Sequence, residues 1–232
     1  MRTLTGKDIL NTIKSNERFS KIIRLHKILS NKFGPVVIGG GSLVDCFYDR
    51  DFYDVDIFIS VNDLKEKYRK NYTSKNHLLD VIKIKIDGEA IDIIVVDYSV
   101  EEHISRFDQN FKRIWYNGKL YIAPEAVRDI RNNEITLGSF NGPVVFFRCL
   151  KSSMKYNMTI NKDDLYIMHN YLSYLKDFNL AKKYEEYRHL FVKAETIDSK
   201  LAVATRDYSK MYWDLDVIKL PSFKEFKKQI LN

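Results

Sequence analysis

Residues 39–59 read GGGSLVDCFYDRDFYDVDIFI, and this stretch decides the fold. A short apolar strand over 36–38 runs into the glycines, a helix is expected to open after them, and a second strand begins at Asp54. Residues i and i+2 of a strand face the same way, so Asp54 and Asp56 lie side by side while Val55 and Ile57 point into the core. The stretch therefore predicts a glycine turn close to two neighbouring carboxylates.

Two adjacent carboxylates repel each other, and a hard cation such as Mg²⁺ between them would remove that repulsion. Asp92 lies in the apolar run 91–96 and is a candidate third acid, able to hold a second ion; alternatively it pairs with Lys83 or Lys85. Glycines let a backbone approach a phosphate closely, and Ser42 adds a hydroxyl donor. Together these features indicate phosphoryl or nucleotidyl transfer.

Two other phosphate or metal motifs are excluded by their spacing. The glycines are not followed by the Gly-Lys pair of a P-loop. An EF-hand loop counted from Asp49 would need glycine where Asp54 stands and glutamate where Ser60 stands.

The rest of the chain predicts a sheet followed by helices. Helical spacing runs through 6–32, and helices are also expected at 62–71, 99–107 and 124–131. Asp87-Gly88 predicts a hairpin between strands 81–86 and 90–96, and Asn117-Gly118 predicts another between 114–116 and 120–122. After Pro143 the pattern is helical, with further helices expected at 162–178 and 180–192. We therefore expect an α+β fold: a small mixed sheet backed by helices over 1–140, and an all-helical part over 141–232.

Composition limits the classes of protein that fit. The 232 residues suit one large or two small globular domains, and 30% charged residues with 45% hydrophobic residues argue against disorder. Two cysteines exclude a disulfide scaffold and favour a reducing, cytoplasmic setting. We expect no signal peptide and no membrane span. The net charge of +7, of which five charges fall in 141–232, favours an anionic partner.

The order Gly40-Gly41-Ser42-Leu43-Val44-Asp45, eight residues, Asp54-Val55-Asp56 resembles the head motif of the DNA polymerase β-like nucleotidyltransferases. The match is closest to the class II tRNA CCA-adding enzymes and bacterial poly(A) polymerases, whose motif is Gly-Gly-x-x-Arg-Asp, eight residues, Asp-x-Asp. Residues 106–110, 117–120, 127–130 and 143–160 are similar to later segments of the head and to its first neck helix. The resemblance covers about residues 34–160.

The resemblance implies a function and a set of site residues. It implies two Mg²⁺ ions, or Mn²⁺ in their place, held by Asp54, Asp56 and a third acid assigned to Asp92. Gly40, Gly41 and Ser42 would bind the nucleoside triphosphate. An RNA 3′ hydroxyl, from tRNA or another RNA, would attack the α-phosphate, and pyrophosphate would leave.

The sequence also departs from the family pattern. Val44 replaces the head-motif arginine, and the base-reading Glu-Asp-x-x-Arg falls on residues 141–145, Asn-Gly-Pro-Val-Val, which lack both acids and the arginine. Selection of bases by that route is therefore not expected.

Four cations were weighed as further site residues. Arg50 follows the glycine turn and either contacts a phosphate or is a solvated loop charge. Arg148, Lys151 and Lys155 share one helix face, which either tracks an RNA backbone or is solvated.

Three functions remain open: transfer to RNA, transfer to a protein or small molecule, and RNA binding without catalysis. The abundance of Lys, Asn, Ile and Tyr also favours an AT-rich, phage-encoded source, acting in the host cytoplasm.

Overall fold

A computed structural model describes residues 4–69, 78–140, 143–174, 193–194 and 215–216. Its helices are α1 (Gly6–Ser15), α2 (Glu17–Phe33), α3 (Gly41–Phe47), α4 (Glu66–Arg69), α5 (Val100–Ser105), the 3₁₀ turn η1 (Asn110–Lys112), α6 (Pro124–Asn132), α7 (Pro143–Tyr156) and α8 (Lys162–Tyr174). Its strands are β1 (Val37–Gly39), β2 (Asp54–Ser60), β3 (Leu78–Ile86), β4 (Glu89–Val96), β5 (Ile114–Tyr116), β6 (Leu120–Ile122), β7 (Glu134–Ile135), β8 (Thr159–Ile160), β9 (Lys193–Ala194) and β10 (Leu215–Asp216).

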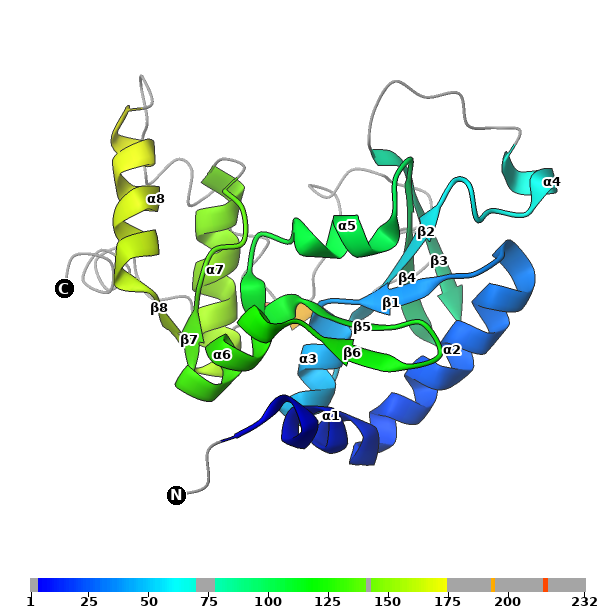
Figure 1. Ribbon diagram of the computed structural model, residues 1–232, viewed down its shortest axis with the longest axis horizontal. Coiled ribbons are helices and arrows are strands. Elements are labelled where there is room, and N and C mark those ends of the chain that lie inside the picture. The colour runs from blue at the N-terminus through cyan, green and yellow to red at the C-terminus, as the bar shows by residue number, and fades with distance from the viewer. Residues whose placement is uncertain (1–3, 70–77, 141–142, 175–192, 195–214, 217–232) are drawn as a thin grey trace.

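The centre of the molecule is a six-stranded sheet in the order β3-β4-β2-β1-β5-β6 (Figure 1). Neighbouring strands are antiparallel except β2 and β4, which run parallel through seven residue pairs. The chain reaches β4 through β3, and the β3–β4 hairpin turns at Asp87 and Gly88, both with positive φ, as the Asp-Gly pair predicts. The expected α+β architecture with a mixed sheet is confirmed.

The two faces of the sheet are covered unequally. Helices α1, α2 and α3 bury one face in the main core, which contains Val55, Ile57, Ile91 and Ile93. The opposite face carries a smaller cluster under α5, formed around Phe58 and Val96 (Figure 1). Strand alternation assigns Asp54, Asp56 and Asp92 to this second face, because their neighbours in sequence point into the main core.

Helix α7 joins the sheet part to the C-terminal segment. Phe146, Phe147 and Cys149 belong to the same main core as the sheet, and Gln109 accepts a hydrogen bond from Ser152 at 2.8 Å. A short parallel pair, β7 with β8, connects the segments before and after the predicted boundary near residue 140. That boundary remains a prediction.

Two expectations differ from the structure. The helix expected at 62–71 begins only at Glu66, as α4 (Glu66–Arg69), because the backbone N–H groups of Asp63 and Leu64 bond the Ser60 carbonyl and close a turn first. Residues 70–71 of that expected helix lie outside the described residues. Short strands β8, β9 and β10 interrupt the C-terminal part that was expected to be entirely helical. The helix expected at 180–192, and the end of the one expected at 162–178, lie outside the described residues.

Candidate active site

The glycine turn connects β1 to α3 and lies next to Asp56, a carboxylate of β2. Gly40 has a φ of 82°, which favours glycine, and its N–H donates to the Ile114 carbonyl at 3.1 Å. A Cβ at Gly40 would lie 3.5 Å from the Phe107 ring and 3.8 Å from Asp56 Oδ2. A Cβ at Gly41 would meet nothing within 4 Å. The turn therefore opens into free space directly beside Asp56.

The parallel pairing of β2 with β4 brings the three predicted acids together. Asp56 is directly opposite Asp92 in the ladder, and Asp54 precedes Asp56 by two residues on the same face. Asp54 is exposed, whereas Asp56 and Asp92 are partly buried. Asp54, Asp56 and Asp92 thus form one acidic group on the inner strands β2 and β4, beside the glycine turn.

Nearby cations only partly balance the negative charge around Asp56. The pKa of Asp56 is raised to about 7, first by burial and then by the charges of Asp54 and Asp92. Lys112 and Lys83 oppose this shift without cancelling it. A carboxylate with so high a pKa favours a proton or a cation at its side.

Asp92 has a partner of its own. Lys83, opposite it on β3, donates from Nζ to Asp92 Oδ2 at 2.7 Å, and both side chains are largely buried. The pairing with Lys83, one of the two alternatives for this acid, is therefore present. In the part of the chain that the structure describes, no three His, Cys, Asp or Glu side chains are arranged as a metal-binding group. The pair Asp54 and Asp56 is consequently the stronger candidate for cation binding.

The three cations of α7 face the sheet part. Arg148 pairs with Asp108 at 3.0 Å, and Lys155 pairs with the buried Asp45 at 2.7 Å. Lys151 lies between them on the same helix face and interacts electrostatically with Asp54. Two of the three charges are thus committed to carboxylates within the protein, and Lys151 faces the acidic group.

The pKa of Lys151 is lowered to about 8, first by burial and then by Lys112 and other nearby cations, while Asp54 raises it. Lys151 is nevertheless exposed, so water screens much of this effect. Lys112, on η1, has a pKa lowered mainly by burial and acts on both Asp45 and Asp56. Lys112 is not among the residues predicted from the sequence; its place two residues after the family-like segment 106–110 was the available signal.

Two other predicted residues differ in their setting. Ser42 is buried, and its Oγ has no hydrogen-bond partner among the described residues. Arg50 is exposed, and its backbone N–H donates to the Asp45 carbonyl at 2.8 Å. Ser42 thus has a hydroxyl that is buried at the start of α3 and unpaired among the described residues, and the role of the Arg50 side chain remains a prediction.

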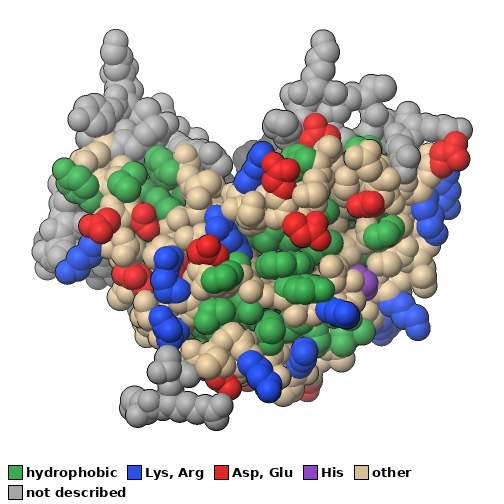
Figure 2. Space-filling view, viewed as in Figure 1, with side chains coloured by type: hydrophobic (Ala, Val, Ile, Leu, Met, Phe, Trp, Pro, Cys, Tyr) green, Lys and Arg blue, Asp and Glu red, His purple; other side chains and the backbone are tan. Residues whose placement is uncertain are grey.

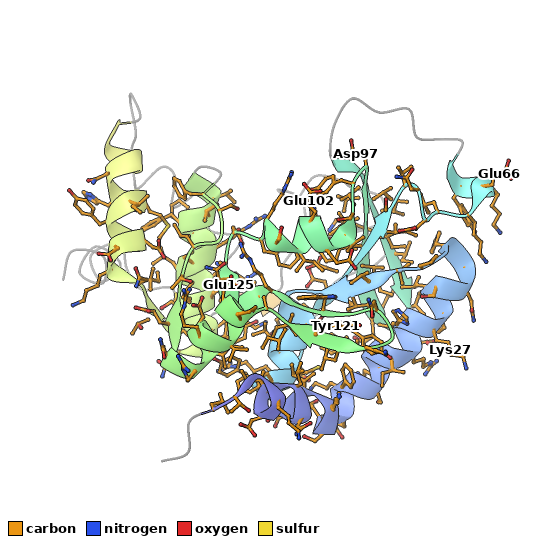
Figure 3. All side chains as sticks on the ribbon, in the orientation of Figure 1. Lys27, Glu66, Asp97, Glu102, Tyr121 and Glu125 are labelled. Carbon is orange, nitrogen blue, oxygen red and sulfur yellow. The ribbon has the colours of Figure 1, made fainter. Side chains whose placement is uncertain are left out.

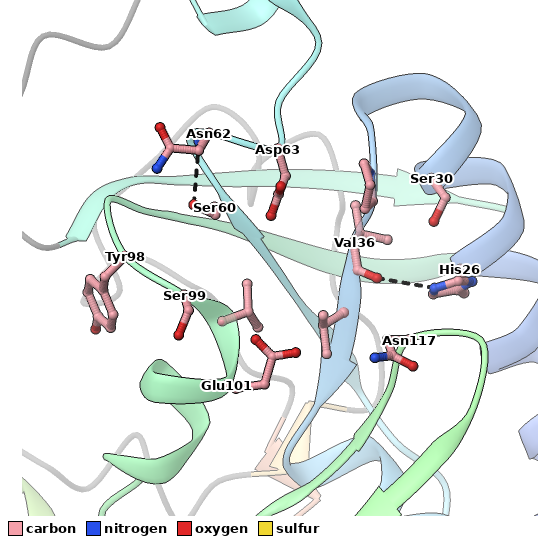
Figure 4. Close-up of a pocket in the computed structure, with 13 residues that line it drawn as sticks. His26, Ser30, Val36, Ser60, Asn62, Asp63, Tyr98, Ser99, Glu101 and Asn117 are labelled. Atoms are coloured by element: carbon pink, nitrogen blue, oxygen red, sulfur yellow. Dashed lines mark hydrogen bonds between the residues drawn. The ribbon is translucent and has the colours of Figure 1, made fainter.

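A separate open pocket of about 670 Å³ lies at the other end of β1 and β2 (Figure 4). It is lined by polar groups that include Ser60, Tyr98, Glu101 and Asn117, and none of the predicted site residues reaches it. His26 at its rim contacts the Val36 carbonyl at 3.1 Å and has a pKa lowered by burial. The candidate active site and the pocket are therefore distinct.

No protein-family model and no curated protein sequence matches this chain. Solved structures do match its fold, and CCA-adding and tRNA-processing enzymes are among them. A Thermotoga maritima CCA-adding enzyme complexed with tRNA matches at 16% identity and a TM-score of 0.50, covering 66% of this chain and 42% of that one. A CCA-adding enzyme with ATP matches at 16% identity and a TM-score of 0.53, covering 75% and 47%.

A tRNA-processing enzyme in an apo form matches at 15% identity and a TM-score of 0.50, covering 68% of this chain and 47% of the other. This chain thus spans less than half the length of these solved structures. The predicted resemblance to a nucleotidyltransferase head and neck is confirmed at the level of the fold.

Proposed function

We propose that this chain is a metal-dependent nucleotidyltransferase that transfers a nucleoside monophosphate from an NTP to the 3′ hydroxyl of an RNA, releasing pyrophosphate. The observation that carries the proposal is the neighbouring pair Asp54 and Asp56, with a raised pKa at Asp56, beside an open glycine turn on a sheet with the fold of CCA-adding enzymes. The RNA acceptor is supported by the similarity in fold to a CCA-adding enzyme whose structure contains tRNA.

The glycine turn is proposed to hold the triphosphate. Gly40 and Gly41 leave room for a phosphate close to the backbone, and the Ser42 hydroxyl has no protein partner to give up among the described residues. Arg50 is proposed to contact a phosphate from the following loop. Lys151 and Lys112, whose charges reach Asp54 and Asp56, would stabilise the negative charge that develops during transfer.

The carboxylates fit a divalent cation. Asp54 and Asp56 offer hard oxygen ligands, and the raised pKa of Asp56 indicates that a positive charge is missing beside it. Mg²⁺, or Mn²⁺ in its place, would supply charge neutralisation of the phosphates when bound. Asp92 is proposed as the third ligand for a second ion, in competition with Lys83.

The reaction makes and breaks one bond at the α-phosphorus. The 3′ oxygen of the acceptor bonds to phosphorus, the bond to the β-phosphate oxygen breaks, and pyrophosphate leaves with that electron pair. The hydroxyl proton is proposed to pass to a carboxylate oxygen of Asp92. The main contribution of the protein is to hold both reactants in line.

The cations of α7 are proposed to act near the site more than along an RNA backbone. Arg148 and Lys155 are paired with carboxylates of the sheet part, so Lys151 is the one best placed to meet a phosphate. Because Val44 is fully buried and residues 141–145 lack the base-reading acids, we do not expect selection of C and A by the family's usual residues.

The test is transfer of labelled nucleotide to RNA with Mg²⁺, using each of the four NTPs. Asp54→Ala combined with Asp56→Ala should lower transfer by at least about a thousandfold while the circular dichroism spectrum stays native. Asp63→Ala, which removes an exposed acid of the separate pocket, is the matched control and should keep full activity. Unchanged transfer in the double variant would contradict the proposal.

The nature of the labelled product decides the acceptor. RNase should remove the label from products made in a cell extract. Removal by protease instead would assign the same chemistry to a protein acceptor. Absence of transfer with every NTP, together with retained RNA binding, would favour the non-catalytic alternative.

A further inference from the structure

A row of residues paired across neighbouring strands runs through the sheet from Asp92 in the acidic group to Tyr121 on the edge strand β6. Asp92 is opposite Asp56 on β2, and the pairs Val37↔Phe58 and Ile38↔Ile57 bring Gly39 next to Asp56. Gly39 is in turn opposite Trp115 on β5, and Trp115 is opposite Tyr121 on β6. With strands about 4.8 Å apart, the backbone of Trp115 is about 10 Å from that of Asp56.

The two aromatic residues at the end of this row form a stacked pair. The rings of Trp115 and Tyr121 are 5.4 Å apart between centroids and inclined by 13°. Trp115 is half-buried beside the cluster under α5, and Tyr121 is 38% exposed on the edge strand. Figure 2 shows hydrophobic side chains gathered on this open face over β5 and β6, and Figure 3 shows Tyr121 on the same side as α5.

This stacked pair has features that suit a nucleobase. A flat aromatic surface stacks with any base. Gly39 carries no side chain of its own between the aromatic pair and the acids, and the Phe58 ring packs over that position. Lys119, exposed at the hairpin tip two residues before Tyr121, offers a positive charge for a phosphate of the same strand.

We propose that Trp115 and Tyr121 form a platform on which a base at the 3′ end of the acceptor RNA stacks while its hydroxyl reaches the acidic group. This inference rests on the proposed function. The attacking and leaving oxygens lie in line across the α-phosphorus. Lys151 on α7 attracts the triphosphate, and the acceptor is proposed to enter over β5 and β6, where Tyr121 is exposed.

The first test measures binding without catalysis. The chain contains two tryptophans, so Trp213→Phe makes Trp115 the single fluorescent reporter. A single-stranded oligoribonucleotide should quench Trp115, and the same oligonucleotide with abasic sites at its 3′ end should quench it much less. Equal quenching by both would overturn the proposal, because the bases would then not contact the pair.

The second test measures the effect on the reaction. Tyr121→Ala should raise the KM for the RNA acceptor by about tenfold, since loss of one stacking contact corresponds to roughly a 5- to 150-fold change in affinity. The KM for NTP should stay unchanged. Tyr121→Phe keeps the ring and should restore the acceptor KM, and Tyr166→Ala, which removes a 67% exposed ring on α8, should have no effect.

The two proposals fail in different ways. If wild-type protein transfers nucleotide to RNA and Tyr121→Ala has the wild-type acceptor KM, the platform is wrong and the proposed function stands. If wild-type protein transfers nothing to RNA with any NTP, the proposed function is wrong, and so is the platform as an acceptor site.

Discussion

Two groups of carboxylates in this molecule have opposite surroundings. Asp45 on α3 is 2% exposed and receives Lys155 Nζ at 2.7 Å and the Tyr156 hydroxyl at 2.9 Å. Asp129 on α6 is 1% exposed and accepts from the N–H and hydroxyl of Thr136 as well as from Arg128. Asp56 faces two other carboxylates, and its pKa is raised to about 7.

The comparison separates acids that support the fold from acids that serve a site. A buried carboxylate with its hydrogen bonds complete holds two segments together: Asp45 joins α3 to α7. A carboxylate beside other carboxylates lowers the stability of the free protein, and it is useful where a cation or proton is to be bound. Each of the following predictions tests one side of this comparison.

The largest effect is expected from breaking the Asp45 pair. Lys155→Met leaves the buried Asp45 charge with the Tyr156 hydroxyl and the weaker influence of Lys112, so the free energy of unfolding in urea should fall by about 3 kcal/mol. Arg148→Met on the same helix is the matched control, because its bridge to Asp108 is half-exposed and should contribute less than about 1 kcal/mol. Equal losses in the two variants would show that Asp45 is not the joint between α3 and α7.

An intermediate effect on the free energy of unfolding is expected from Asp56 in the metal-free protein. Its pKa is higher in the folded than in the unfolded state, so its proton favours folding, and stability should fall as the pH rises from about 4 through 7. Asp56→Asn removes the charge and should flatten this part of the profile, raising the free energy of unfolding at pH 8 in EDTA by on the order of 2 kcal/mol. Thermal unfolding at several pH values measures both.

Mg²⁺ or Mn²⁺ should stabilise the wild-type protein at pH 8 more than the Asp56→Asn variant. Asp63→Asn should behave like wild type, because that side chain is exposed at the separate pocket. If the stability of the wild-type protein does not change between pH 4 and 7, the charge of Asp56 does not destabilise the free protein, and the contrast with Asp45 and Asp129 fails.

The smallest effect is expected from Lys83, which gives one carboxylate of the acidic group, Asp92, a cation as its partner. Lys83→Met leaves Asp92 without its cation, so the affinity of the free protein for Mn²⁺ should rise severalfold, measured by electron paramagnetic resonance of unbound Mn²⁺. Lys85→Met on the same strand is exposed and serves as the control. An unchanged affinity would mean that Asp92 does not take part in cation binding.

Much of the sheet and of the acidic group could be predicted from local patterns. The Asp87-Gly88 pair fixes a two-residue hairpin, and strand alternation around Asp54 and Asp92 fixes which side chains leave the core. The spacing of the glycine turn and Asp54-Val55-Asp56 predicted the fold that the solved structures share.

What could not be predicted depends on how segments meet in space. The direction in which α7 faces is set by Gln109 bonding Ser152 and by Asp45 bonding Lys155, contacts between residues far apart in the sequence. The choice of Lys83 over Lys85 for Asp92 required the β3–β4 register. The pairing of Trp115 with Tyr121 could have been predicted, because the short hairpin around Asn117-Gly118 already sets these two residues opposite each other.

The parallel ladder between β2 and β4 has a consequence for how this chain can change over time. The relative position of Asp56 and Asp92 is set by the seven residue pairs of that ladder, so it does not depend on the length of chain that connects the two strands. Insertions or deletions between β2 and β3 are therefore expected to leave the acidic group intact. Length differences among descendants of this sequence should concentrate there, and that segment is the natural place to insert a tag or a second domain.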